Sequence, residues 1–432
     1  MHNPVFTDDC KTTPYWWDHT PRLELPSPAM PAKADVVVIG AGYTGLCAAL
    51  HTARGGRSTV VIDAEDAGWG CSTRNGGQIS TSLKPEFEKL SSQYGAKDAF
   101  NILKEGHNAL AWIEDFVASE EIDCHFKICG KFLGAHNPVQ YEYLGNKIGD
   151  QVKGLESGAY LVPRAEQHSE LGSDFYHGGV VFPKYASVDP ARLHHGILKR
   201  VLDAQVTVFE RCQALSIDRD SNGFRVTTSR GSIWAGDVIV ATNGYTSTLT
   251  PWHRRRIIPI GSYVISTEPV APSLMDRLIP RDRMIGDTRR LVYYYRSSPD
   301  RKRIVFGGRV SLAESDPFIT GPKLYASMVK IFPELAQTRI SHSWVGFVGY
   351  TFDTLPHLGK HGGIHYAMGY CGSGVAMASY LGMRVGQQLL GQKEGQTGLD
   401  GLSFQTRPLY TGKPWFLSAS ILAYRWLDRL NI

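Results

Sequence analysis

The chain has 432 residues, of which 42% are hydrophobic and 20% are charged, and its formal net charge is +5. This composition is typical of a soluble globular protein, and the length favours two domains over one core. Its only basic cluster, Arg254-Arg255-Arg256, is too short for an extended nucleic-acid groove, so the charge favours small acidic molecules as partners.

Seven cysteines are scattered along the chain, and no second half of a metal-ligand pattern accompanies Cys124 and Cys129. We therefore expect reduced thiols, no metal site and a cytoplasmic location. The first twenty residues lack the pattern of a signal peptide, and no stretch reaches the ~18 apolar residues of a membrane span. The apolar segment 416–427 is interrupted by Arg425, so we expect a docking helix there, with an interfacial anchor as the alternative.

The predicted elements begin after a polar, proline-bearing extension over residues 1–32. Apolar runs at 35–40 and 58–63 are typical of strands buried on both faces, and the segment 45–54 between them has helical character. This order predicts a β-α-β unit with short connections. Further along the chain we expect helices at 85–120, 190–202 and 375–390, strands at 124–135, 178–186, 206–209, 237–242 and 363–369, a hairpin of 224–229 with 232–235, and paired strands at 291–296 and 303–308.

A glycine-rich turn joins the first predicted strand to its helix. Gly40, Gly42 and Gly45 form a G-x-G-x-x-G pattern, and Asp63 ends the next strand about twenty residues on. The first glycine permits a tight turn, the second admits a pyrophosphate and the third lets helix and strand pack closely. The pattern predicts a dinucleotide site, and an acid at this position favours FAD or NAD over NADP.

The stretch GCSTRNGGQ, residues 70–78, has no apolar residue and no secondary-structure period. An ordinary surface loop is one interpretation. The other is a loop that lies beside the bound pyrophosphate and reaches a flavin ring, which carries several polar acceptors that a nicotinamide cofactor lacks. Ser72, Thr73 and Arg74 would then bond the cofactor, and Gly76 and Gly77 would bring backbone N–H groups close to it.

A second glycine-rich turn, GYCGSG at 369–374, precedes the helix that begins at Val375. Such a helix N-terminus stabilises negative charge. Together with GAGYTGLCAAL, VVIDAEDAGWGCSTRNGGQ and WVGFVGYTFDTLPHLGK, this turn resembles the D-amino-acid-oxidase-type FAD oxidoreductases, nearly end to end. The resemblance implies an α/β fold, with a Rossmann-type FAD-binding domain and a second, mainly antiparallel β-sheet substrate domain.

The resemblance implies a discontinuous FAD-binding domain over 33–115, 187–262 and 336–390. The substrate domain would cover 116–186 and 263–335, and a C-terminal tail with the docking helix would cover 391–432. The motifs and the resemblance together predict these cofactor-binding residues: Gly40, Gly42, Tyr43, Thr44, Gly45, Asp63, Ala64, Gly70, Cys71, Ser72, Arg74, Asn75, Gly76, Gly77, Gln78, Gln213, Ala214, Asn243, Gly244, Gly372, Ser373, Gly374 and Val375.

Flavin amine oxidation moves a hydride from the carbon beside a neutral amine to flavin N5, so the protein mainly orients and desolvates the substrate. Strand alternation places Tyr293 and Tyr295 on one face and Tyr294 and Arg296 on the other, and either pair could face the pocket. Sheet packing and a surface ion pair are the alternative roles. As catalytic candidates we predict Tyr295, Arg296, Tyr370 and Cys371, and as pocket walls, with core packing as the alternative, Tyr293, Trp344, Tyr350 and Phe352.

Two departures from the family pattern matter. Some members tether FAD through a cysteine in the segment corresponding to WVGFVGYT, which has none here, so we expect non-covalent FAD. Some members also carry an oxygen-activating lysine on the strand at 303–308, but Lys302 falls outside that position. The electron acceptor is therefore either oxygen, giving hydrogen peroxide, or a quinone or carrier.

The expected reaction is oxidation of the C–N bond of an amine or amino acid to an imine, which hydrolyses to an aldehyde or oxo acid. A gamma-glutamylated polyamine is one candidate substrate. A flavin-binding protein without turnover and an NAD-linked dehydrogenase are the alternatives, against which the intact flavin loops argue.

Overall fold

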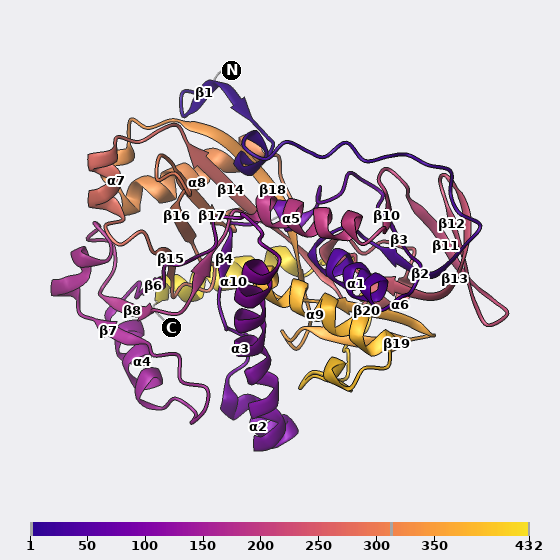
Figure 1. Cartoon of the computed structure of the whole chain (residues 1–432). Helices are drawn as coiled ribbons and strands as arrows, with labels where there is room; N and C mark the ends of the chain where they lie inside the picture. The colour runs from indigo at the N-terminus through magenta and orange to yellow at the C-terminus, as the bar shows by residue number, and fades with distance from the viewer. Residues whose placement is uncertain (1–2, 312–313, 431–432) are drawn as a thin grey trace.

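The structure, a computed structural model, describes residues 3–311 and 314–430. Two large sheets lie at opposite ends of the molecule, and helices lie between them (Figure 1). The α-helices are α1 (Tyr43–Arg54), α2 (Phe87–Tyr94), α3 (Ala96–Ser119), α4 (Pro138–Gly149), α5 (Pro190–Asp203), α6 (Pro251–Arg254), α7 (Pro272–Leu278), α8 (Pro317–Ile331), α9 (Gly374–Leu389) and α10 (Leu417–Leu430). Short 3-10 helices are η1 (Tyr15–Asp18), η2 (Cys71–Thr73), η3 (Arg164–Ser169), η4 (Asn243–Tyr245), η5 (Pro333–Leu335) and η6 (Lys393–Gly395).

The eight-stranded sheet has the order β10-β3-β2-β13-β12-β11, with β20 beside β13 and β19 beside β20. Parallel pairing runs from β10 through β3 and β2 to β13, and β20 also pairs parallel with β13. The continuous apolar runs in the sequence predict this parallel arrangement. The strands are β2 (Lys33–Ile39), β3 (Thr59–Ile62), β10 (Thr207–Phe209), β11 (Ala214–Asp220), β12 (Gly223–Thr228), β13 (Gly231–Val240), β19 (His357–His361) and β20 (Ile364–Met368).

The nine-stranded sheet has the order β1-β18-β14-β17-β16-β15-β6-β8-β7, and most of its neighbouring strands are antiparallel. This confirms the expected fold class. The strands are β1 (Phe6–Lys11), β6 (Lys131–Gly134), β7 (Tyr160–Val162), β8 (Gly179–Phe182), β14 (Ile258–Thr267), β15 (Met284–Asp287), β16 (Tyr294–Ser297), β17 (Ile304–Gly308) and β18 (Ile340–Tyr350). A small third sheet holds β4 (Gln78–Ile79), β9 (Ala186–Ser187) and β5 (Lys127–Ile128).

Several boundaries differ from the sequence prediction. The segments at 232–235 and 237–242 form one strand, β13, which pairs antiparallel with β12 and parallel with β2. The predicted helix at 85–120 is broken between α2 and α3 at Gly95, whose φ of 85° ends the first helix. β18 belongs to the nine-stranded sheet because it pairs with β14 along nearly its whole length, although the predicted boundary at 336 assigned it to the FAD-binding domain.

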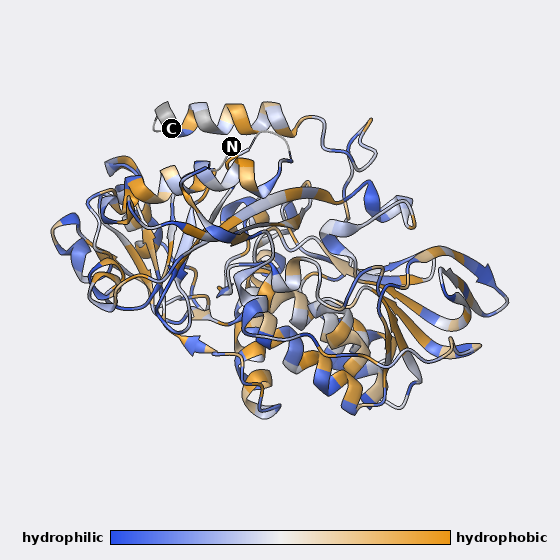
Figure 2. Ribbon diagram, turned by 90° about the horizontal axis from the view of Figure 1, so that it is seen from above, coloured by the Kyte–Doolittle hydropathy of each residue, from blue (hydrophilic) through white to orange (hydrophobic). Residues whose placement is uncertain are grey.

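The N-terminal extension is more than a connecting segment. β1 joins the edge of the nine-stranded sheet beside β18, and Trp16 of η1 is completely buried. At the other end of the chain, α10 lies at the periphery of the molecule, with apolar and polar residues alternating along it (Figure 2). Within the described residues, no helix combines the length and apolar character needed to span a bilayer.

Candidate active site

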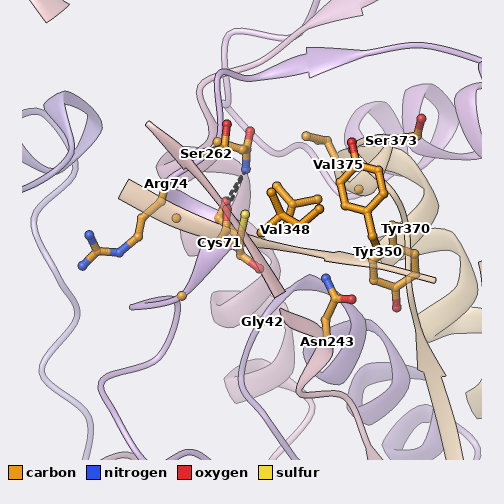
Figure 3. A pocket seen from close by; sticks show the side chains of 18 of the residues that line it. Gly42, Cys71, Arg74, Asn243, Ser262, Val348, Tyr350, Tyr370, Ser373 and Val375 are labelled. Atoms are coloured by element: carbon orange, nitrogen blue, oxygen red, sulfur yellow. Dashed lines mark hydrogen bonds between the residues drawn. The ribbon is translucent and has the colours of Figure 1, made fainter. Parts of the chain in front are cut away.

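A cavity of about 1090 Å³ lies between the two large sheets, and residues of both sheets, α1, α9 and α10 line it. This volume reaches the upper end of the ~300–1,000 Å³ of ordinary small-molecule pockets, which suits a dinucleotide together with a second small molecule. Figure 3 shows part of its wall, with Cys71 on one side, Tyr350 and Tyr370 on the other, and Val348 between them.

The first glycine turn brings the N-terminus of α1 to this cavity. Gly40 has a φ of 111°, and a Cβ there would lie 2.9 Å from the Ala241 carbonyl oxygen. A Cβ on Gly45 would lie 1.8 Å from the Gly40 carbonyl oxygen, so Gly45 serves close packing and does not line the cavity. The turn therefore needs its glycines for the reasons that the motif implies.

Asp63 follows β3 and lies beside this turn. Its Oδ2 accepts a hydrogen bond from the Ala41 N–H at 2.6 Å, and its Oδ1 accepts one from the Glu65 N–H at 2.9 Å. Burial raises the pKa of the carboxyl to about 6, although both backbone bonds favour the ionised form. The carboxylate is thus held at the cavity wall where a ribose hydroxyl can donate to it.

The loop at 70–78 is held partly by its own side chains. The Asn75 side-chain amide donates to the carbonyl oxygens of Cys71 and Ser72 at 3.0 and 2.9 Å, and its Oδ1 accepts from the Gly77 N–H at 2.8 Å. The Ser72 hydroxyl accepts from the Tyr43 N–H at 3.0 Å, at the start of α1. The loop therefore closes over the helix N-terminus instead of lying free on the surface.

Three tryptophans outside the loop hold its backbone in place, and sequence reasoning missed this role. The Nε1–H groups of Trp16 and Trp344 donate to the carbonyl oxygens of Asn75 and Arg74, each at 2.9 Å, and that of Trp17 donates to the Thr73 hydroxyl at 2.8 Å. The predicted pocket wall Trp344 is fully buried and does not line the cavity, because it is part of this support.

The Arg74 guanidinium does not point toward the centre of the cavity. Its Nε donates to the Trp69 carbonyl oxygen at 2.6 Å, and its Cζ lies 4.7 and 4.9 Å from the ring centres of Trp69 and Trp17. In Figure 3 the group points away from Val348 and the tyrosines. The part of Arg74 that borders the cavity is thus anchored by stacking against aromatic rings.

The second glycine turn is tied to the first. The Tyr370 hydroxyl donates to the Ala367 carbonyl oxygen at 2.9 Å and accepts from the Thr44 hydroxyl at 2.6 Å. Tyr370 lines the cavity, but its hydroxyl is occupied by these two bonds. The contact joins the N-termini of α1 and α9, so the Tyr370 side chain holds the two glycine turns in position.

Cys371 and Asn243 complete this turn. Cys371 has a φ of 51°, its Sγ lies 3.1 Å from the Gly369 carbonyl oxygen, and burial raises its pKa to about 11. It is buried and does not line the cavity, so the geometry adds nothing to its catalytic role, which stays a prediction. Asn243 accepts from the Gly369 N–H at 2.9 Å and does line it.

Tyr295 and Arg296 also lie away from the cavity wall, so their catalytic roles stay predictions that their positions do not support. Tyr295 is fully buried in the core of the nine-stranded sheet, where its ring stacks on Phe306. The Arg296 guanidinium donates to the backbone carbonyl oxygens of Gly77 and Val188 at 3.1 and 2.9 Å, and neither residue lines the cavity. Backbone carbonyl oxygens therefore bind the Arg296 guanidinium.

Tyr294 lies on the opposite face of the strand from Tyr295, and it lines the cavity. Its hydroxyl forms a 2.8 Å hydrogen bond with that of Ser262, and its ring crosses Gly307, where a Cβ would lie 2.2 Å from it. Tyr293 packs against Phe306 and does not line the cavity. Strand alternation thus separated the two faces of the strand correctly, but the sequence could not show which face is buried in the core.

The remaining predicted residues fall into two groups, those that line the cavity and those that do not. Tyr350 and Phe352 line the cavity, while Gly45, Gly77 and Gly244 do not. Gly77 and Gly244 pack against backbone instead, since a Cβ would lie 2.1 Å from the Val188 and 2.6 Å from the Phe347 carbonyl oxygen. The predicted cofactor residues that line the cavity are Gly40, Gly42, Tyr43, Thr44, Asp63, Ala64, Gly70, Cys71, Ser72, Arg74, Asn75, Gly76, Gln78, Gln213, Ala214, Asn243, Gly372, Ser373, Gly374 and Val375.

Sequence reasoning missed two further groups of wall residues. Lys84 and Lys131 line the cavity, and Phe416, Ile421 and Tyr424 line it from the C-terminal segment. The lysines lie outside every motif, and only the fold brings them there. The described residues contain no group of three or more His, Cys, Asp or Glu side chains that could hold a metal ion.

The wall fits a flavin adenine dinucleotide. Two helix N-termini offer backbone N–H groups, glycines leave space along both turns, and Asp63 provides an acceptor for a ribose. The polar loop 70–78 lies along the same cavity. Together, the fold and the site define a two-domain dinucleotide-binding protein of the flavoenzyme class.

Comparison with known proteins identifies the family. The sequence profile of the FAD dependent oxidoreductases, DAO, matches residues 35–388. The chain belongs to this family; it is an enzyme, an FAD-dependent oxidoreductase, as the motifs led us to expect.

The chain is 30% identical over 421 residues to the "Probable oxidoreductase OrdL" of Rhizobium meliloti (strain 1021), covering 95% of this chain and 96% of the relative. It is 29% identical over 374 residues to the "Gamma-glutamylputrescine oxidoreductase" of Escherichia coli (strain K12), covering 83% and 84%. Among solved structures, glycine oxidase from Geobacillus kaustophilus superposes with a TM-score of 0.73 at 16% identity, covering 88% of this chain and 99% of that one. This last likeness shows the fold.

Proposed function

We propose that this enzyme oxidises the C–N bond of an amine or amino acid, with a gamma-glutamylputrescine-like compound as the leading substrate and oxygen as the electron acceptor. The observation that carries the proposal is one continuous cavity that runs from both glycine turns to the aromatic face of the nine-stranded sheet. Bound FAD would accept the hydride. The name of one relative, gamma-glutamylputrescine oxidoreductase, supports the choice of substrate class.

The wall residues suit a reaction that needs orientation more than acid–base catalysis. No histidine occurs among the described residues that line the cavity, and the Asp287 carboxylate is paired with Arg289. The ring faces of Tyr294, Tyr350 and Phe352 would exclude water and hold a neutral amine. The imine product then hydrolyses to an aldehyde or oxo acid, with release of ammonia or an amine.

Oxygen as the acceptor is supported by charge. Lys302 is exposed and lies outside the cavity wall, as its position in the sequence indicated, but Lys84 and Lys131 line that wall. Positive charge in a partly desolvated cavity stabilises the anions that form as oxygen is reduced.

A quinone or protein carrier is the second candidate acceptor. The observation in its favour is the outer face of α10, where Leu422 and Trp426 are 52% and 63% exposed. Exposed apolar groups of this size are suited to contact with a partner or with an apolar acceptor.

The test uses the purified holoenzyme under anaerobic conditions with a panel of amines and amino acids, among them gamma-glutamylputrescine and glycine. We expect the visible flavin absorption to bleach with members of this panel. Admission of air would restore the absorption within seconds and release one hydrogen peroxide per turnover if oxygen is the acceptor. A flavin that bleaches with no amine would overturn the proposal, and slow reoxidation in air with fast reoxidation by a soluble quinone would assign the dehydrogenase.

A further inference from the structure

Lys131 brings a buried cation to the part of the cavity that β6 lines. In this strand Lys131 and Leu133 face the cavity, whereas Phe132 packs into the core of the nine-stranded sheet. The neighbouring strand leaves room for the ammonium, since a Cβ on Gly286 would lie 2.8 Å from Lys131 Cε and 3.0 Å from Nζ. The space that glycine leaves is therefore filled by the lysine side chain.

Lys84 places a second ammonium in the same region. The side chain of Lys84 is exposed, and its Nζ lies 6.0 Å from the centre of the Tyr350 ring. Burial, and to a smaller extent the charge of Lys84, lowers the pKa of Lys131 to about 8, against the opposing effect of the Asp287 carboxylate. Within the part of the chain that the structure describes, neither ammonium has an ion-pair partner. The Asp287 carboxylate attracts the Lys131 ammonium, but it is itself paired with Arg289.

Lys131 is partly desolvated, which is costly for a cation, and the like charge of Lys84 at the exposed rim adds to that cost. An anion bound beside Lys131 and within reach of Lys84 lowers both costs. The walls beside Lys131 are apolar: Phe182 and Tyr185 stack with ring centres 4.9 Å apart, and Met284 and Leu133 also line the cavity. A ligand with methylene groups that ends in an anion matches this combination.

We propose that Lys131 and Lys84 bind a carboxylate of the substrate, so that the enzyme selects amines carrying an anionic group over plain amines and polyamines. The inference rests on the proposed function, since the carboxylate belongs to the amine that is oxidised. A polyamine would bring a second ammonium toward two like charges and would be rejected. A carboxylated amine gains charge-assisted hydrogen bonds at the same place.

The test compares ω-amino acids of increasing length with n-alkylamines of the same length, in which a methyl group replaces the carboxylate. Dissociation constants are measured anaerobically from the perturbation or bleaching of the flavin spectrum in holoenzyme. We expect the wild-type enzyme to bind at least one amino acid at least tenfold more tightly than its matched alkylamine. In Lys131→Met this ratio should fall at least tenfold, and Lys131→Arg should restore it to within threefold of wild type.

Lys302→Met is the matched control, because Lys302 is an exposed lysine outside the cavity wall. Its ratio should equal that of wild type, and Lys84→Met should lower the ratio as Lys131→Met does. The inference is overturned if wild type prefers the alkylamines, or if Lys131→Met weakens both members of each pair by the same factor. Lys131-dependent binding of carboxylates without bleaching by any amine would overturn the proposed function and leave only an anion site at Lys131, so the two failures are distinguishable.

Discussion

At the scale of single residues, the site depends on buried polar groups whose partners are mostly backbone. Asp63 accepts two N–H groups from the chain around it, and Tyr370 joins the two glycine turns through Thr44 and Ala367. Such groups are satisfied before any ligand enters, so the protein can present a preformed wall to its cofactor.

Asp63 leads to a pH-dependent prediction. Its folded-state pKa of about 6 lies above the usual value for an aspartate, so the folded protein binds the proton more tightly than the unfolded chain does. The contribution of this group to apoprotein stability is therefore largest below about pH 4 and falls as pH rises to about 6. In Asp63→Asn, the free energy of unfolding relative to wild type should rise by ~1–2 kcal/mol between pH 4 and pH 7.

Urea denaturation of both apoproteins at the two pH values measures this difference. Since the other titratable groups are the same in both proteins, their effects cancel in the comparison. A relative stability that stays constant with pH would show that burial does not raise the pKa of Asp63.

At the scale of elements, two segments far from the glycine motifs complete the site. η1 supports the loop at 70–78 through Trp16 and Trp17, and α10 covers the cavity with Ile421 and Tyr424. Both lie near the ends of the described chain, outside the discontinuous FAD-binding domain that the sequence predicts.

The support by η1 predicts the effect of Trp16→Phe. This change keeps a buried ring but removes the 2.9 Å hydrogen bond to the Asn75 carbonyl oxygen, leaving a buried acceptor without that donor. We expect FAD affinity to fall roughly tenfold, in line with about 1–2 kcal/mol for a lost buried bond. Titration of the apoprotein with FAD, followed by quenching of flavin fluorescence, measures it. Trp415→Phe, at a side chain that is 72% exposed, should have no effect.

The cover formed by α10 predicts the effect of Asp428→Ala. The Asp428 carboxylate accepts from the backbone N–H groups of Arg290 and Leu291 at 3.0 and 3.5 Å and so ties the helix to the edge of the cavity. Without it the helix should open more often, and FAD should dissociate several-fold faster. Stopped-flow dilution into a flavin scavenger measures the rate. Leu422→Ala, on the outer face, is the control, and equal rates in the two variants would contradict the covering role.

At the scale of the whole molecule, the cavity lies between the two large sheets, so one ligand contacts parts of both. The wall includes Gly40 and Asp63 after strands of the eight-stranded sheet and Tyr294 and Val348 of the nine-stranded sheet. A ligand that binds only the folded arrangement stabilises both parts together.

FAD should therefore raise the thermal unfolding temperature of the apoprotein in one cooperative transition. At a free concentration of 100 times the dissociation constant, the gain is about 2.7 kcal/mol. Riboflavin, which lacks the pyrophosphate and adenosine, should give a much smaller shift because it cannot occupy the first glycine turn. Differential scanning calorimetry distinguishes these outcomes, and equal shifts with both ligands would contradict our assignment of the first turn.

The sequence by itself determined the family and its cofactor, and most of the residues that it predicts to bind this cofactor line the cavity. Gly40, Gly42, Asp63 and the loop at 70–78 act through local backbone geometry and short connections, so their spacing along the chain already implies their spacing in space.

Only the tertiary structure decided which face of β16 meets the cavity, that Trp344 supports a loop instead of forming a wall, and that Lys131 lies beside Gly286 and lines the cavity. These positions depend on strand pairing between distant segments, such as β14 with β18 and β15 with β6. Neither hydrophobic period nor motif spacing encodes such pairing, because it follows from the packing of the whole chain.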